Sequence, residues 1–257
     1  MNREINPEYL KHWINGRADT STLRSSIIGY LLLLVDFVMI APLFADPFEA
    51  IYFQILIPPT VLLHLWGLWI AVAPYKNQVA SELYMGIFGV FVTVGYGICS
   101  MKMFYGVLGF TTPLYAIALT AVYIAGYYVL FKRHFQNLSS GYYYDHAVIR
   151  AGDKKNSGLK YASFGGLGVF LGNLVVGMAS GNTTIGLLAG LFLFFAALNS
   201  LLTLSIHRYV LMKRYPELTI IQRKPVKKTK EASSQIGNNP EYISSTGTKS
   251  LVGDEEE

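Results

Sequence analysis

Two ionisable residues, Asp36 and His64, lie deep inside long apolar runs of this sequence. An ionised group costs at least about 2.5 kcal/mol in the hydrocarbon of a membrane, so such residues are the first candidates for function. At 1.5 Å per residue, Asp36 lies about 16 Å and His64 about 13 Å from the end of its run. A carboxylate beside an imidazole can share or relay a proton. The pair therefore predicts a proton-coupled or cation-binding site. The alternative is a structural hydrogen bond or an Asp36 that stays protonated.

Milder polar side chains occur at a similar depth in three other apolar runs: Thr93, Thr120 and Asn173. They could line a polar path shared with the ionisable pair. They could equally hydrogen-bond between helices or to their own backbone, as such groups commonly do in membrane bundles.

Two prolines, Pro58 and Pro59, interrupt the run that holds His64. Because a proline removes one backbone hydrogen bond of a helix, we expect a kink at this point. The kink would serve either as a hinge or site of a transporter or as a fixed bend that improves packing.

The elements that must carry these residues are strongly apolar, since 52% of the 257 residues are hydrophobic and only 14% are charged. An ordinary soluble domain carries about 25% charged residues. Runs of about 20 apolar residues are long enough to cross a bilayer. This composition excludes a soluble domain, a disordered protein and a disulfide scaffold. We predict an all-α, polytopic integral membrane protein with six transmembrane helices, near residues 25–45, 51–73, 83–101, 113–131, 161–180 and 184–205.

The positive charges predict the orientation of these helices. With the N-terminus inside, all but one of the 21 Lys and Arg residues lie on the cytoplasmic side, and Lys102 alone lies outside. Both termini are therefore expected in the cytoplasm, and the compact loops favour a bacterial plasma membrane. The predicted regions are a cytoplasmic leader (1–24), helices one to four (25–131), a cytoplasmic loop (132–160), a helical hairpin (161–206) and a largely disordered cytoplasmic tail, basic and then acidic (207–257).

The leader contains the signals of a short helix. Asn6 can cap its start, Pro7 suits its first position and Gly16 can end it. Four apolar residues of this helix would share one face: Tyr9, Leu10, Trp13 and Ile14. We expect an amphipathic helix on the inner membrane surface, with an ordered cytoplasmic turn as the alternative.

Glycines recur at four-residue intervals in the last two predicted helices: Gly168, Gly172, Gly177, Gly181, Gly186 and Gly190. This spacing lets two helix backbones approach closely, so it predicts a tight hairpin. The helix near 83–101 adds four more glycines: Gly86, Gly89, Gly95 and Gly97. A glycine face left over from internal packing could bind the helix of another membrane protein.

A basic cluster follows the last predicted helix: Arg223, Lys224, Lys227, Lys228 and Lys230. Such a cluster suits anionic lipid headgroups, or it simply enforces the topology. No aromatic interleaving supports a nucleic-acid partner, so none is expected.

Motifs of known enzyme classes are absent, among them a Walker glycine loop, a His-Glu-x-x-His pair and a Gly-x-Ser-x-Gly elbow. The five histidines do not have the spacing of metal ligands, and we expect neither a metal nor a cofactor. The sequence favours a non-enzymatic membrane protein that acts as a subunit, accessory or immunity-type component through helix packing with a membrane partner. The alternative is a small-solute or ion transporter, proton-coupled through Asp36 and His64. An enzyme that modifies lipids would need paired acidic or metal-binding residues.

Overall fold

The computed structural model describes residues 6–16, 19–145 and 181–222, and these residues form helices and turns without a strand. The predicted all-α fold is thus confirmed for the described part of the chain. Five helical segments are long and apolar enough to cross a membrane, which indicates a multi-pass membrane protein: Thr20–Phe44, Ala50–Val72, Gln78–Val107, Leu114–Ser139 and Gly181–Arg214. The sixth predicted span, 161–180, lies outside the described residues, and the sidedness of the termini stays a prediction.

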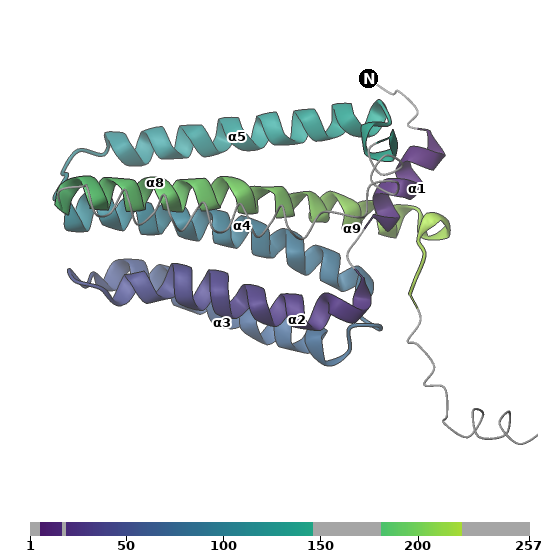
Figure 1. Ribbon diagram of the computed structural model, residues 1–257, viewed down its shortest axis with the longest axis horizontal. Coiled ribbons are helices and arrows are strands. Elements are labelled where there is room, and N and C mark those ends of the chain that lie inside the picture. The colour runs from purple at the N-terminus through teal and green to yellow at the C-terminus, as the bar shows by residue number, and fades with distance from the viewer. Residues whose placement is uncertain (1–5, 17–18, 146–180, 223–257) are drawn as a thin grey trace, which may run out of the picture. The chain divides into compact units, whose positions relative to one another are not determined.

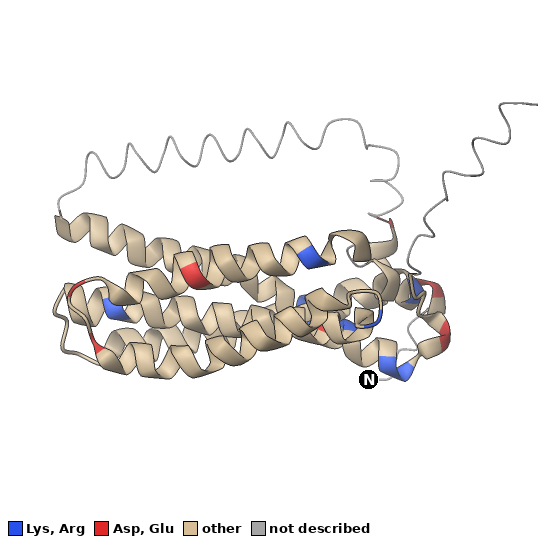
Figure 2. Cartoon of the chain, turned by 90° about the horizontal axis from the view of Figure 1, so that it is seen from below, with Lys and Arg blue, Asp and Glu red and all other residues tan. Residues whose placement is uncertain are grey.

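The described helices lie in three layers (Figure 1). Helices α4 (Gln78–Lys102) and α8 (Gly181–Ser200) form the middle layer, α5 (Leu114–Ser139) lies on one side, and α2 (Thr20–Tyr30) and α3 (Ala50–Val72) lie on the other. In the most apolar stretch of each span, 61% of the residues are buried around α4, 33% in α3 and only 6% in α5. Helix α4 is therefore the core of the bundle. Figure 2 shows most of the charged residues near the ends of the described helices.

Glycines on α4 allow this central position. A Cβ atom on Gly86 would lie 2.7 Å from the backbone nitrogen of Ile206, and one on Gly89 would lie 2.9 Å from that of Thr203. The other two α4 glycines face side chains of neighbouring helices: Gly95 faces Met39 and Gly97 faces Tyr123. All four glycines of α4 therefore contribute to packing within the protein.

The last described span continues α8 through a 3₁₀ turn, η4 (Leu201–Thr203), into α9 (Leu204–Arg214). A Cβ atom added to any of the three described glycines of the predicted hairpin, Gly181, Gly186 and Gly190, would meet no atom within 4 Å. The remaining glycines of that pattern lie outside the described residues: Gly168, Gly172 and Gly177. The predicted hairpin contact is therefore not tested.

The first span is not one regular α-helix. It passes from α2 into a π-helix, η1 (Leu31–Ile40), and ends in a 3₁₀ turn, η2 (Ala41–Phe44). A π-helix of ten residues is unusual, because π-turns mostly occur singly and often at functional sites. Nothing in the sequence analysis predicted it.

Helix α3 runs unbroken from Ala50 to Val72 with Pro58 and Pro59 inside it. Each proline lacks the backbone N–H that would bond to the carbonyl four residues earlier, yet the chain stays helical on both sides. The two prolines therefore do not unwind the helix, and the predicted kink stays a prediction.

The N-terminal helix α1 (Pro7–Asn15) begins and ends as predicted. The Asn6 side chain accepts a hydrogen bond from the Glu8 amide at 2.9 Å, and Gly16 follows the last turn. Two residues of its apolar face, Leu10 and Ile14, are buried in a cluster with residues of α5 and α9: Leu138, Leu211 and Met212. This face is thus covered by protein, which the expectation of a helix lying on the membrane surface did not foresee.

Two helices continue past the predicted region boundaries. Helix α5 extends to Ser139, eight residues into the predicted loop that starts at 132. The predicted tail that starts at 207 contains most of α9 and the 3₁₀ turn η5 (Pro216–Leu218). A helix can extend beyond the membrane, so the predicted ends of the spans stay predictions.

The segment after α9 is also held to the bundle up to residue 222, although the sequence predicts disorder there. The Gln78 side chain donates to the Gln222 carbonyl at 2.7 Å, and its oxygen accepts from the Gln222 amide at 3.0 Å. The Asn15 side chain makes a similar pair of bonds with Leu218 and Ile220. The two side chains thus supply the hydrogen-bond partners that backbone groups of this non-helical segment need. The rest of the tail, with its basic cluster, lies outside the described residues.

Lys102, the predicted lone outer cation, is buried at the opposite end of the bundle. Its ammonium donates three hydrogen bonds to carbonyls at the end of the first span: those of Pro42 at 2.9 Å, Leu43 at 2.9 Å and Ala45 at 2.7 Å. An ammonium has three N–H donors, so all of them are used. Lys102 thus serves as a cap for a helix end.

Candidate functional site

The structure brings Asp36 and His64 together. Asp36 lies in η1 and His64 in α3, and the His64 Nε2 atom lies 3.2 Å from each carboxyl oxygen of Asp36. The other ring nitrogen, Nδ1, lies 2.9 Å from the carbonyl oxygen of Thr60, one turn earlier in α3. The two consecutive spans are thus antiparallel neighbours whose deepest ionisable groups meet.

This geometry limits the hydrogen bonds that the pair can form. A carbonyl oxygen can only accept, so a hydrogen bond between Nδ1 of His64 and Thr60 needs the hydrogen on Nδ1. A hydrogen bond between Nε2 and the Asp36 carboxyl group then needs one further proton, which either an imidazolium or a carboxylic acid would supply. Either arrangement would be electrically neutral, which lowers the cost of the pair inside a membrane.

The π-helix that carries Asp36 is held by side chains of α4. The Tyr96 hydroxyl donates to the Leu34 carbonyl at 3.1 Å, and the Cys99 thiol donates to the Met39 carbonyl at 3.3 Å. Val35 and Met39 are fully buried against the core. These contacts fix one side of η1 on α4 and leave Asp36 on the side of α3.

The pair lies on the outer surface of the bundle. The exposed fractions of the Asp36 and His64 side chains are 43% and 28%. Large exposed apolar side chains surround them, such as Phe37 (74%) and Leu65 (61%). Neither residue of the pair lines the cavity between α5 and α8 described below. The pair is thus a polar spot on an apolar surface.

The milder polar residues do not bond to this pair. The Thr93 hydroxyl donates to the Ala196 carbonyl of α8 at 3.2 Å, and the Thr93 carbonyl accepts a hydrogen bond from Tyr123 of α5. The Thr120 hydroxyl donates to the Ala116 carbonyl of its own helix. These are the contacts between helices and to the backbone that the sequence offered as the second alternative. Asn173 lies outside the described residues.

The sequence analysis missed a second polar cluster, at the end of the bundle that carries α1. Arg208 of α9 and Glu82 of α4 form an ion pair of 3.1 Å with both side chains largely buried. The Arg208 Nε also donates to the Trp13 carbonyl at 3.1 Å, and the guanidinium lies over the Trp13 ring at 4.4 Å. Glu82 and Arg208 are 126 positions apart, so no spacing rule could connect them.

Two histidines join the same end of the bundle. The Nε2 atom of His134 lies 2.8 Å from Nδ1 of His207, and Nδ1 of His134 lies 2.9 Å from the Tyr143 hydroxyl. Burial raises the pKa of the Tyr143 phenol, so this hydroxyl keeps its proton at neutral pH. The Tyr143 hydroxyl can therefore donate to Nδ1 of His134, and Nε2 of His134 can in turn donate to Nδ1 of His207. Within the described ranges, no three His, Cys, Asp or Glu side chains lie close enough to hold a metal ion together.

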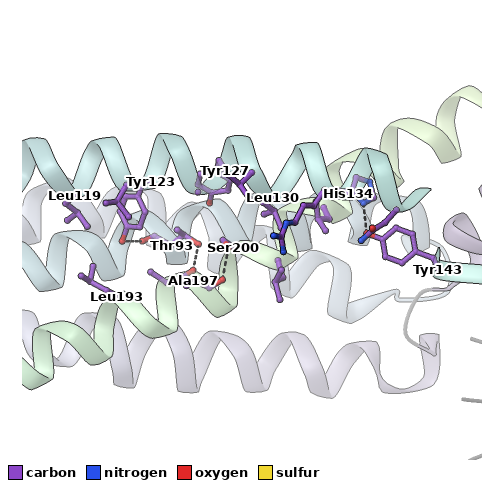
Figure 3. A pocket seen from close by; sticks show the side chains of 18 residues that line it. Thr93, Leu119, Tyr123, Tyr127, Leu130, His134, Tyr143, Leu193, Ala197 and Ser200 are labelled. Carbon is purple, nitrogen blue, oxygen red and sulfur yellow. Dashed lines mark hydrogen bonds between the residues drawn. The ribbon is translucent and has the colours of Figure 1, made fainter. Parts of the chain in front are cut away.

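A cavity of about 540 Å³ opens between α5 and α8, with α4 at its base. Figure 3 shows Leu119, Tyr123 and Leu130 of α5 on one side, and Leu193 and Ala197 of α8 on the other. His134 and Tyr143 lie at one end of this groove.

Comparison of the chain with known protein families, with curated proteins and with solved structures finds no match. The function must therefore be argued from these sites.

Proposed function

We propose that the protein is a non-enzymatic integral membrane protein that acts as a subunit or accessory component of a membrane complex. The partner would contact the surface of η1 and α3 around Asp36 and His64. The observation that carries this proposal is the exposure of this hydrogen-bonded pair midway along two apolar helices. Polar groups that face lipid cost free energy, whereas a partner helix with a hydrogen-bonding side chain would cover them.

The surroundings of the pair support a helix-packing surface. Seven large apolar side chains of η1 and α3 are exposed near it in sequence: Leu32, Leu33, Phe37, Val61, Leu62, Leu65 and Leu68. A single polar contact within an apolar helix interface favours one register of the partner, as a buried polar residue does in a coiled coil. The glycines of α4 are already occupied inside the bundle, so the partner would pack against η1 and α3.

Replacement of both polar residues tests this surface. Because Asp36→Leu together with His64→Leu removes the polar contact, a stoichiometric companion purified in mild detergent should decrease about three- to tenfold. Asp36→Asn should retain the companion, since the amide can donate to Nε2 of His64 as a carboxylic acid does. Thr120→Val is the matched control, because it removes a mid-span hydroxyl on α5. Quantitative mass spectrometry of the purified complex measures the ratio.

Two results would contradict the proposal. One is a wild-type protein that purifies without any stoichiometric companion from its native membrane. The other is a folded double-leucine variant that retains its companion in full.

The contact between the His64 ring and the Asp36 carboxyl group favours one alternative, a proton-coupled transporter. Asp36→Asn distinguishes the two functions, because it keeps a hydrogen bond to His64 but cannot exchange the proton. In liposomes with a pH gradient, the purified chain should show no flux above that of empty liposomes if it is an accessory component. A pH-dependent flux that Asp36→Asn abolishes would instead establish transport.

A further inference from the structure

The groove between α5 and α8 is an open pocket as far as the described residues define it. Its volume of about 540 Å³ falls within the range of about 300–1,000 Å³ typical of small-molecule sites. Gly126 lines the groove at its middle, and a Cβ atom there would meet no atom within 4 Å. Nothing in the described residues fills this part of the groove.

The lining changes from apolar to polar along α5. Leu119, Val122 and Leu130 line the apolar part, and Arg133 and Asn137 line the polar end. From Leu119 to Leu130 the helix rises about 16 Å at 1.5 Å per residue. This length is about half of a hydrocarbon core of about 30 Å, the depth of one lipid leaflet. The groove thus has the polarity profile of a single lipid molecule.

Two polar groups of the groove are unsatisfied. Arg133 is exposed and forms no hydrogen bond or ion pair with the described residues. The buried hydroxyl of Tyr127, midway along the groove, also lacks a partner among them. A guanidinium binds a phosphate through two parallel hydrogen bonds, and a phenol can donate to an ester oxygen.

We propose that this groove binds one anionic phospholipid, with an acyl chain along Leu119–Leu130 and the phosphate at Arg133. The unpaired Arg133 at the polar end of the lining favours an anionic headgroup over an apolar helix as the occupant. The site is separate from the surface of Asp36 and His64, so the two proposals fail independently.

The test uses the full chain purified in detergent and native mass spectrometry. The probes are dioleoyl phosphatidylglycerol and dioleoyl phosphatidylcholine, which differ only in the headgroup, with excess inorganic phosphate as a competitor. Wild type should retain phosphatidylglycerol in preference to phosphatidylcholine. Arg133→Gln should reduce this preference about five- to tenfold, whereas Lys132→Gln, the same charge change one position away, should leave it unchanged.

A second pair of variants tests the acyl part of the site. Gly126→Leu places a side chain in the groove, where the Cβ atom meets no atom within 4 Å, and should remove both lipids. Gly29→Leu, at a helical glycine of α2 that also has open space around it, should bind lipid as wild type does. Equal retention of the two lipids by wild type, displacement by inorganic phosphate, or full retention by Gly126→Leu would overturn the proposal. Loss of a companion protein in place of lipid from Gly126→Leu would assign the groove to a partner helix.

Discussion

Single residues in this protein matter chiefly where they satisfy backbone groups inside the bundle. The Lys102 ammonium is the clearest example, because it donates to three carbonyls at the end of the first span. The charge count treated this residue as an outer cation, yet it is buried. The last carbonyls of a helix lack amide partners within it, and the buried Lys102 ammonium supplies donors to such carbonyls.

We expect Lys102→Met to lower the free energy of unfolding by on the order of 2 kcal/mol, because it leaves buried carbonyls without a donor. Lys76→Met is the control, since Lys76 is exposed. Denaturant-induced unfolding of the purified chain in detergent micelles measures both. If the two variants unfold alike, Lys102 is not a structural cap.

At the scale of elements, α4 decides the packing of the bundle. Its glycines let the last span approach so closely that backbone meets backbone near Ile206 and Thr203. Gly29 of α2 and Gly126 of α5, which lines the groove, have open space instead. The same residue type thus has opposite consequences on different helices.

Gly86→Ala should therefore destabilise the protein by about 1–3 kcal/mol, since the added methyl group would overlap Ile206. Gly126→Ala should leave stability unchanged or raise it by up to about 1 kcal/mol, because alanine favours a helix. Thermal unfolding in detergent compares the two. An equal effect of both substitutions would show that α4 and α9 do not meet as closely as described.

At the scale of the whole molecule, the described helices place their connections at two opposite ends. The turn between α4 and α5 lies at one end, and α1 and α9 lie at the other (Figure 1). The positive charges predict that the end with α1 and α9 is cytoplasmic.

Cysteine labelling of intact cells tests this orientation. A membrane-impermeant maleimide should label Gly109→Cys in intact cells and Lys213→Cys only after the cells are permeabilised. The native Cys99 is buried and serves as the unlabelled background. Labelling of Gly109→Cys only from the cytoplasmic face would invert the predicted topology.

Much of the architecture follows from the sequence because it depends on local properties. Long apolar runs must be helical in a membrane, where every backbone group needs an internal partner. This argument predicts the start of each of the five described spans to within about five residues. It also predicts the N-terminal helix, because Asn6 and Pro7 act on adjacent backbone groups.

The sequence also proposed the pair Asp36 and His64, since two consecutive spans joined by a short turn must be neighbours. Only the tertiary structure decided that the pair faces outward, that α4 is the core, and that Glu82 meets Arg208 across 126 positions. Hydropathy gives the length of a helix but not its rotation, because lipid and protein interior are equally apolar. Which face of each helix is covered therefore depends on contacts between distant segments, which no local pattern records.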